Sequence, residues 1–197
     1  MAVGGRVGYA VATPEGMPVT RHLVFVASVL LLSLPVAAQP DNKPVPVSKE
    51  VRAAWEKKGM VTGWVRLTGG GFMQFVNDGE AIAGDVPTFL VPGPTPGLFV
   101  GLPDADREFS VLVYPGPIDG LKLGAEDLKA LAGMKRLSLI ALTNTSIPSV
   151  KELGESKGLK HLYLVKNGLT DGRIAGLSKV EGLQSLSLND NDDLTDA

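Results

Sequence analysis

Three stretches in the second half of the chain share one spacing of apolar residues. They begin at 137, 159 and 183, so their starts lie 22 and then 24 residues apart. Aliphatic residues fill positions 1, 4 and 6 of each stretch and recur at position 11 or 12, after a polar residue at position 9: Leu137, Ile140, Leu142, Thr145, Ile147; Leu159, Leu162, Leu164, Asn167, Leu169; Leu183, Leu186, Leu188, Asn191, Leu194. Alternate residues of a strand share a face, so positions 4 and 6 predict an extended segment with one buried side.

A second apolar pattern lies between these stretches and recurs in step with them. Its residues are spaced by three: Leu128, Leu131, Met134; Val150, Leu153, Ser156; Ile174, Leu177, Val180. This spacing suits a short α-helix or 3₁₀ turn with one buried face. Thr170-Asp171 and Pro148-Ser149 stand where such segments would begin, and Thr and Asp are good N-caps. Two patterns with one period in the low twenties predict stacked repeats of a strand and a short helical segment.

Position 9 of the repeat is polar in all three copies, as Thr145, Asn167 and Asn191. We expect its side chain to turn inward at the bend after the strand. There it would satisfy backbone groups that no strand pairs, since buried polar groups need partners.

Residues 48–108 predict a small α+β cap. Ser48 is a plausible N-cap for a helix whose apolar stripe is Val51, Ala54 and Trp55 and which ends near Gly59. From Val61 the period changes to two, which predicts a strand to Leu67 with Thr62, Trp64 and Arg66 on its second face. A turn at Gly69-Gly70-Gly71 would lead to a second strand over 72–76, and 81–82 and 88–91 are weaker strand predictions.

Residues 1–38 predict an upstream extension and a secretory signal peptide. Met17 is the better start, because Arg21 and His22 follow it and precede an apolar run, and small residues end the segment at Ala38. We expect cleavage after Ala38. The alternative is a membrane anchor, for which the apolar run is shorter than the roughly 20 residues that span a bilayer. Residues 39–47 are polar and Pro-rich and predict a linker.

Composition limits the partners. The formal net charge is −2, which gives no basic surface for nucleic acid or an anionic membrane. Cysteine is absent, which excludes disulfides and thiolate chemistry.

The repeated residues resemble a leucine-rich repeat protein of the secreted bacterial type, with units of about 24 residues and a Leu-Thr-Asp turn. The resemblance covers 109–197, as an initial repeat 109–136, repeats 137–158 and 159–182, and an incomplete repeat 183–197. In the initial repeat Phe109, Leu112 and Tyr114 would take positions 1, 4 and 6. The resemblance implies an α/β solenoid, with parallel strands on its concave side and short helical or 3₁₀ segments on its convex side. It also implies an exported protein that binds another protein without catalysis or cofactor.

Carried over position by position, the binding face consists of the outward strand residues. These are Ala141, Thr143, His161, Tyr163, Val165, Lys166, Ser185, Ser187, Asn189 and Asp190. His161 and Tyr163 are the strongest candidates, since aromatic side chains dominate binding hot spots. The alternative is that this face is only the solvated side of a sheet.

Other functions are less well supported. A Ser-His-Asp site would have to use His161, whose repeat position already explains it. Asp190, Asp192, Asp193 and Asp196 lack the spacing of a calcium loop, and the residues after the triple glycine do not continue a phosphate loop. We therefore expect no enzyme and no metal site, with an enzyme site in residues 45–108 as a weaker alternative. A self-associating cell-envelope component, joined through an open edge after the last repeat strand, is the other alternative.

Overall fold

The computed structural model describes residues 43–68, 72–93, 95–114 and 122–195. They belong to one compact unit that runs from Pro40 to the end of the chain. The start at Met17, the signal peptide, cleavage after Ala38 and the triple-glycine turn all lie outside the described residues. Among the described helices, none has the length and apolar character that a membrane crossing requires.

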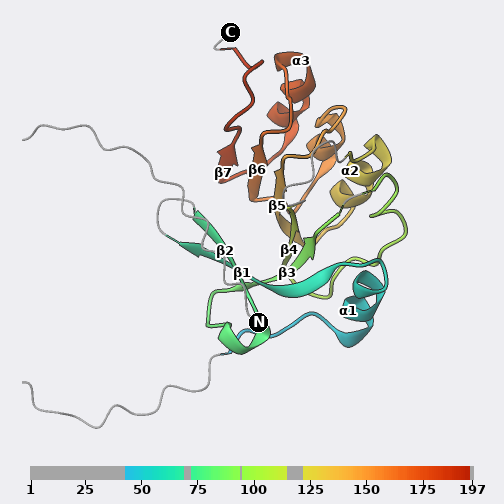
Figure 1. Cartoon of the computed structure of the whole chain (residues 1–197), viewed down its shortest axis with the longest axis vertical. Helices are drawn as coiled ribbons and strands as arrows, with labels where there is room; N and C mark the ends of the chain where they lie inside the picture. The colour runs from blue at the N-terminus through green and yellow to red at the C-terminus, as the bar shows by residue number, and fades with distance from the viewer. Residues whose placement is uncertain (1–42, 69–71, 94, 115–121, 196–197) are drawn as a thin grey trace, which may run out of the picture. The chain divides into compact units, whose positions relative to one another are not determined.

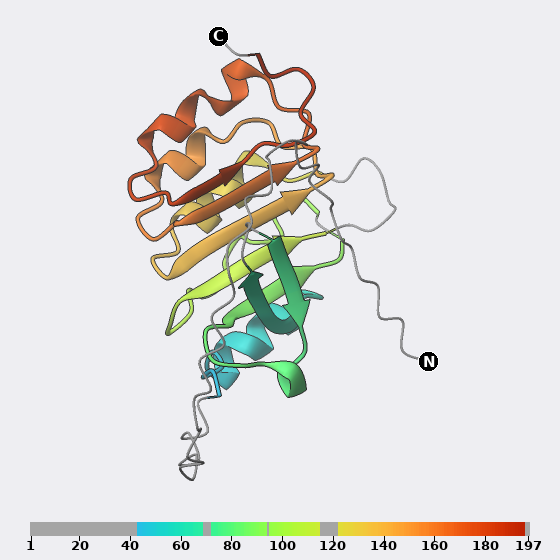
Figure 2. The ribbon, with the colours of Figure 1, turned by 90° about the vertical axis from the view of Figure 1, so that its left-hand side faces the viewer.

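The unit is a mixed α/β structure built on one curled, half-barrel sheet (Figures 1 and 2). Its strand order is β2-β1-β3-β4-β5-β6-β7. The pairs β1–β2 and β1–β3 are antiparallel, and every pair from β3 to β7 is parallel. The strands are β1 (Val61–Thr68), β2 (Phe72–Val76), β3 (Val86–Val91), β4 (Phe109–Val113), β5 (Leu137–Thr143), β6 (His161–Val165) and β7 (Ser185–Ser187).

Short helices cover the outer face of this sheet. They are α1 (Lys49–Glu56), α2 (Ala125–Ala132), α3 (Asp171–Ile174) and the 3₁₀ segments η2 (Lys151–Glu155) and η3 (Ala175–Lys179), while a further 3₁₀ turn, η1 (Asp78–Glu80), follows β2. Figure 1 shows α2, η2 and α3 stacked beside β5, β6 and β7. The helical segments thus appear where the spacing of three predicts them.

The main core lies between this outer face and the helices. Leu162 and Leu164 of β6 are fully buried in it, and Leu162 pairs with Ile140 on one side and Leu186 on the other. Leu186, in the edge strand β7, is 47% exposed, so the predicted buried side is not closed at this repeat. Over β3 and β4, Trp55 of α1 stacks on Phe89 with ring centroids 4.1 Å apart and meets Phe109 edge-on at 5.6 Å. The cap and the repeated segments therefore share one core and one sheet.

The cap follows the predicted pattern with two exceptions. Ser48 caps α1 by accepting a hydrogen bond from the backbone N–H of Val51 at 3.4 Å, which confirms the predicted helix start. Val47, the last residue of the predicted linker, is buried in the main core. Residues 81–82 form no strand; Ile82 is instead exposed and its N–H donates to the Asp85 carboxylate, which bends the chain ahead of β3.

The predicted frame of the initial repeat is shifted by one residue. Val111 and Val113 face the main core, whereas Leu112 lies on the inner face and Tyr114 is about half exposed. The β4–β5 pairing shifts between Phe109 and Ser110, where β5 has one extra residue, Ser138. The extra residue lets Leu137 and Ile140 of β5 both face the main core, whereas β4 alternates without a break, so Phe109, Val111 and Val113 face it instead.

A second, smaller core fills the inner face of the curled sheet. Its buried members are Val65, Leu112, Leu139, Ala141 and Tyr163, and Met73, Val86 and Leu90 pack against them. These residues come from every strand between β2 and β6 in the strand order, and the sheet curls toward this side. Figure 2 shows the β1–β2 hairpin crossing in front of the parallel strands. Because of this second core, β5 is buried on both faces from Leu137 to Leu142.

Candidate functional site

The predicted binding residues lie in register across β5, β6 and β7. One row joins Leu139, His161 and Ser185, and the next joins Ala141, Tyr163 and Ser187. Thr143 pairs with Val165 beyond them. Sequence spacing therefore places the side chains of this set on the expected face of the sheet.

Two of these residues are not displayed to solvent as expected. Ala141 is only 4% exposed and Tyr163 only 8% exposed, because both belong to the inner core with Val65 of the hairpin. The prediction that Tyr163 offers its ring to a partner is wrong in this structure. Nothing in the repeat spacing signals this burial, since the covering residue lies about a hundred positions earlier in the chain.

The part of the inner face that remains accessible lies at its β6–β7 end. We call it the β6–β7 strip and define it as His161, Ser185, Ser187, Asn189, Lys166 and Asp190. The first three are partly buried and the last three are exposed. The strip is polar throughout, and Val165 and Thr143, both partly buried, lie beside it. It can offer a partner hydrogen-bond donors and acceptors, together with one positive charge on Lys166 and one negative charge on Asp190.

His161 and Ser185 form the only described side-chain pair within the strip, with 2.9 Å between His161 Nδ1 and Ser185 Oγ. Burial lowers the pKa of His161, the neighbouring Lys160 lowers it further, and Glu108 opposes both. These effects favour the neutral ring, whose Nδ1 accepts a hydrogen bond from the Ser185 hydroxyl in one tautomer and donates one to its oxygen in the other. Among the described hydrogen bonds, none joins a carboxylate to this ring, so the pair lacks the orienting acid of a catalytic triad.

Lys166 and Asp190 project from equivalent left-handed bends at the ends of β6 and β7. Their φ angles are 56° and 58°, and Asn144 at the end of β5 has a φ of 50°. The ladder continues through these bends, because the N–H of Asn144 donates to Val165 O and that of Lys166 donates to Asn189 O. The backbone therefore fixes where the two exposed charges of the strip stand.

The polar bend residues lie immediately after these positions and are buried. Asn191 Oδ1 accepts from the backbone N–H groups of Asn167 and Leu169, and its Nδ2 donates to the carbonyl of Leu164 at 2.8 Å. Asn167 Nδ2 donates to Thr145 O at 2.8 Å. The asparagine side chain of each of these two bends therefore forms hydrogen bonds with the backbone of the preceding bend. The shorter Thr145 hydroxyl donates to the carbonyl of Thr143, two residues back, at 3.0 Å.

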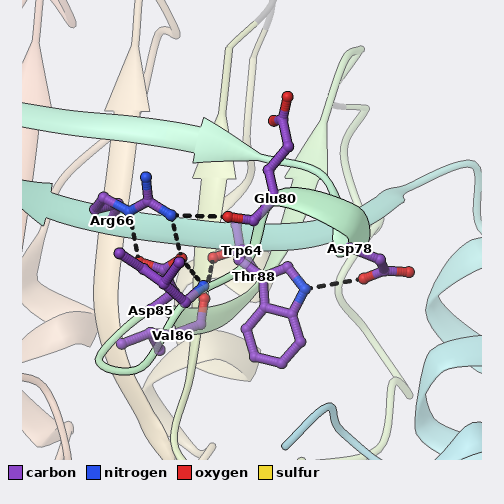
Figure 3. A network of polar contacts seen from close by, with 8 residues as sticks. Trp64, Arg66, Asp78, Glu80, Asp85, Val86 and Thr88 are labelled. Atoms are coloured by element: carbon purple, nitrogen blue, oxygen red, sulfur yellow. Dashed lines mark hydrogen bonds and ion pairs between the residues drawn. The ribbon is translucent and has the colours of Figure 1, made fainter. Parts of the chain in front are cut away.

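The cap contains a polar network that the alternation of residues in β1 does not reveal, although Asp78 and Glu80 themselves are exposed. Figure 3 shows Arg66 turned toward Asp85 and Trp64 turned toward Asp78. Arg66 donates to both oxygens of Asp85, at 2.9 and 2.7 Å, and to the carbonyl of Glu80 at 3.0 Å. The Trp64 indole N–H donates to Asp78 at 2.9 Å. These bonds fasten β1 to the segment between β2 and β3.

Asp85 is the buried member of this network. The hydrogen bond from Arg66 holds the pKa of its carboxyl below its usual value, and the backbone N–H of Ile82 acts in the same direction against the effect of burial. Its role is structural, since all its described partners lie within the cap.

A shallow surface hollow of about 200 Å³ lies beside the network. It is lined by Lys43, Pro44, Pro46, Arg52, Trp64, Asp78 and Ala81. Its Arg52 guanidinium is already paired with Glu56 and Asp78, each at 2.9 Å, so this cation is not free to hold an anionic ligand. Within the described ranges, no group of three or more His, Asp or Glu side chains is placed to hold a metal ion. The β6–β7 strip remains the better candidate site.

Comparisons with models of protein families, with curated proteins and with solved structures find no match to this chain.

Proposed function

We propose that the chain is a short leucine-rich repeat solenoid with an N-terminal cap, exported from the cell, that binds a protein partner through the β6–β7 strip without catalysis. The observation that carries the proposal is the chain of buried bends in which Asn191 bonds to the backbone of the preceding bend and Asn167 bonds to Thr145. The bend residues recur with the 22- and 24-residue spacing of the sequence, and their hydrogen bonds hold the parallel strands in a regular array. Arrays of this kind present side chains on a fixed backbone, which suits protein recognition.

The polarity of the strip supports a protein partner of mixed charge. Lys166 and Asp190 are exposed and stand on neighbouring bends, beyond the strands that carry His161 and the serines. A partner that contacts this strip meets hydrogen-bonding groups of both kinds, and complementary polar groups favour specificity.

Site-specific photo-crosslinking tests the location. A photoreactive residue replaces Ser187 in the full chain, and in a control variant it replaces Lys151, which is exposed on η2 at the outer face. Expressed in the cells that produce the protein, the Ser187 variant should give a discrete adduct that excess unlabelled protein suppresses. An equal adduct from the Lys151 variant, or none from Ser187, would contradict the proposed site.

Alanine replacement of His161 and Ser185 tests whether the strip supplies the binding contacts. Both side chains are partly buried in the described structure, so the double variant should keep its circular-dichroism spectrum while losing the crosslinked adduct. Retention of the adduct would favour the alternative of a structural envelope component. Export has its own test: the N-terminal sequence of the protein recovered outside the cytoplasm should begin at Gln39, and a start at Ala38 or earlier would contradict the expected cleavage.

A further inference from the structure

β2 lies at the end of the sheet opposite β7, and in the described strand order it has a neighbour on one side only. Its five residues pair with β1 without a break, from Phe72 opposite Thr68 to Val76 opposite Trp64. An edge strand of this kind presents a row of backbone N–H and C=O groups to its surroundings.

The sequence of β2 carries none of the usual protection of an edge. Charged side chains, proline and bulges keep edge strands from pairing with other chains. β2 reads Phe72-Met73-Gln74-Phe75-Val76, with no charge and no proline, and its register with β1 is regular. Phe72 is 41% exposed and Gln74 is exposed. By contrast β7, at the other end, has only three residues.

The same five residues are complementary to themselves in the antiparallel direction. With Gln74 at the centre, Gln74 faces Gln74 of a second copy, Met73 faces Phe75, and Phe72 faces Val76. Apolar positions then stand opposite apolar positions, with Val76 buried within its own copy, and the two exposed central amides can exchange hydrogen bonds. No like charges oppose each other, which is the condition that cross-strand pairs require. Such a two-fold arrangement closes on itself and stops at two copies.

We infer that β2 is a self-association edge at which two copies of this chain pair antiparallel about Gln74. The inference does not depend on the β6–β7 strip, because the two regions lie at opposite ends of the strand order. It also differs from self-association through the edge after the last repeat strand, which would use β7. Five residue pairs bury less surface than a standard interface, so the dimer should form at micromolar rather than nanomolar concentration.

A charge exchange at the centre of the pairing tests this inference. Gln74→Lys and Gln74→Glu each place like charges opposite one another in a homodimer, whereas their mixture places opposite charges together. Sedimentation velocity of the full chain should show a wild-type dimer that dissociates on dilution. Each single variant should raise the dissociation constant at least about tenfold. An equimolar mixture should recover dimers, and added salt should weaken only those mixed dimers.

The control variant is Ser187→Lys, which places the same charge on the opposite edge strand and should leave the dimer unchanged. Because Gln74 is exposed, both of its variants should keep the wild-type circular-dichroism spectrum. Hydrogen exchange supplies a second readout: amides of β2 should be protected at high protein concentration and should lose part of that protection on dilution. A wild-type monomer at every concentration would overturn the inference, as would dimers that survive in both single variants or that are lost in Ser187→Lys.

Discussion

The side-chain oxygen of Asn191 accepts the backbone N–H of Asn167 at 2.9 Å, and the two residues are equivalent positions of successive repeats. Asn191 also accepts from Leu169 and donates to the carbonyls of Leu164 and Leu188. A single amide therefore satisfies buried backbone groups in two repeats, where the parallel ladder has ended.

Replacing Asn191 with alanine should destabilise the protein strongly. The N–H groups of Asn167 and Leu169 would stay buried without partners, and each such group costs about 1–3 kcal/mol. We expect the free energy of unfolding to fall by at least about 2 kcal/mol in urea titrations. Asn189→Ala is the control, because Asn189 is exposed and its change should stay within about 0.5 kcal/mol. Equal effects of the two substitutions would show that the bend amide is dispensable.

Gly176 and Gly172 should respond to alanine with opposite signs. A Cβ on Gly176 would lie 2.5 Å from Lys151 Cα, so η2 and η3 would have to separate, at a cost of about 1–3 kcal/mol. A Cβ on Gly172 meets nothing within 4 Å, and alanine is favoured over glycine in a helix by up to about 1 kcal/mol. Thermal unfolding should therefore give a lower midpoint for Gly176→Ala and an unchanged or higher one for Gly172→Ala. A higher midpoint for both would mean that the convex segments are not closely packed.

Lys166 occupies a left-handed backbone conformation that asparagine tolerates better. Lys166→Asn should raise the free energy of unfolding by about 0.5–1 kcal/mol, since the left-handed form costs ordinary residues about 1–2 kcal/mol. Lys166→Val should lower it, because a β-branched residue at this φ is more strained still. Chemical denaturation of both variants checks the sign, and a change in the same direction for the two would contradict the assigned bend.

Asp85 should stabilise the cap in a pH-dependent way. Its pKa is lowered in the folded state, so its contribution is complete above the unfolded pKa of about 4 and is lost as the pH falls through the folded value. Asp85→Asn should therefore be less stable than wild type from pH 7 to pH 5, and the difference should shrink below pH 4. Asp193→Asn, at an exposed position, should differ from wild type by no more than about 0.5 kcal/mol at every pH. A difference for Asp85→Asn that did not depend on pH would mean that its carboxylate is not held by Arg66.

Local patterns sufficed wherever one element's own residues determine its burial. Leu162 and Leu164 lie two apart in the chain and share the main core, and Ser48 caps the helix that its position predicts. The spacing of Thr145, Asn167 and Asn191 likewise located the bends, because a repeat carries the same requirement in every copy.

These local patterns do not predict burial that is caused by segments far away in the sequence. Tyr163 has the sequence position of a displayed residue, yet it is covered because Val65 and Met73 of the hairpin pack over the inner face. The extra residue of β5 opposite Phe109 and Ser110 puts the frames of β4 and β5 one residue out of step, and no residue type there indicates it. The pairing of Arg66 with Asp85 depends on a bend between them that alternation in β1 does not reveal. Each of these features depends on how separate strands pair and pack, and the residue pattern of one segment alone does not determine that.

The two edge strands of the sheet, β2 and β7, lie at opposite ends of the strand order, so self-association and partner binding can occur at the same time. A dimer joined at β2 would leave both β6–β7 strips unoccupied, since each strip lies at the far end of its own strand order. A monomer would then bind one site on a partner, whereas a dimer would bind two sites on a multivalent target. Linked binding of that kind raises avidity by about 10²–10⁴ over a single contact, provided that the target can span both arms. The protein's concentration would therefore govern how tightly it adheres.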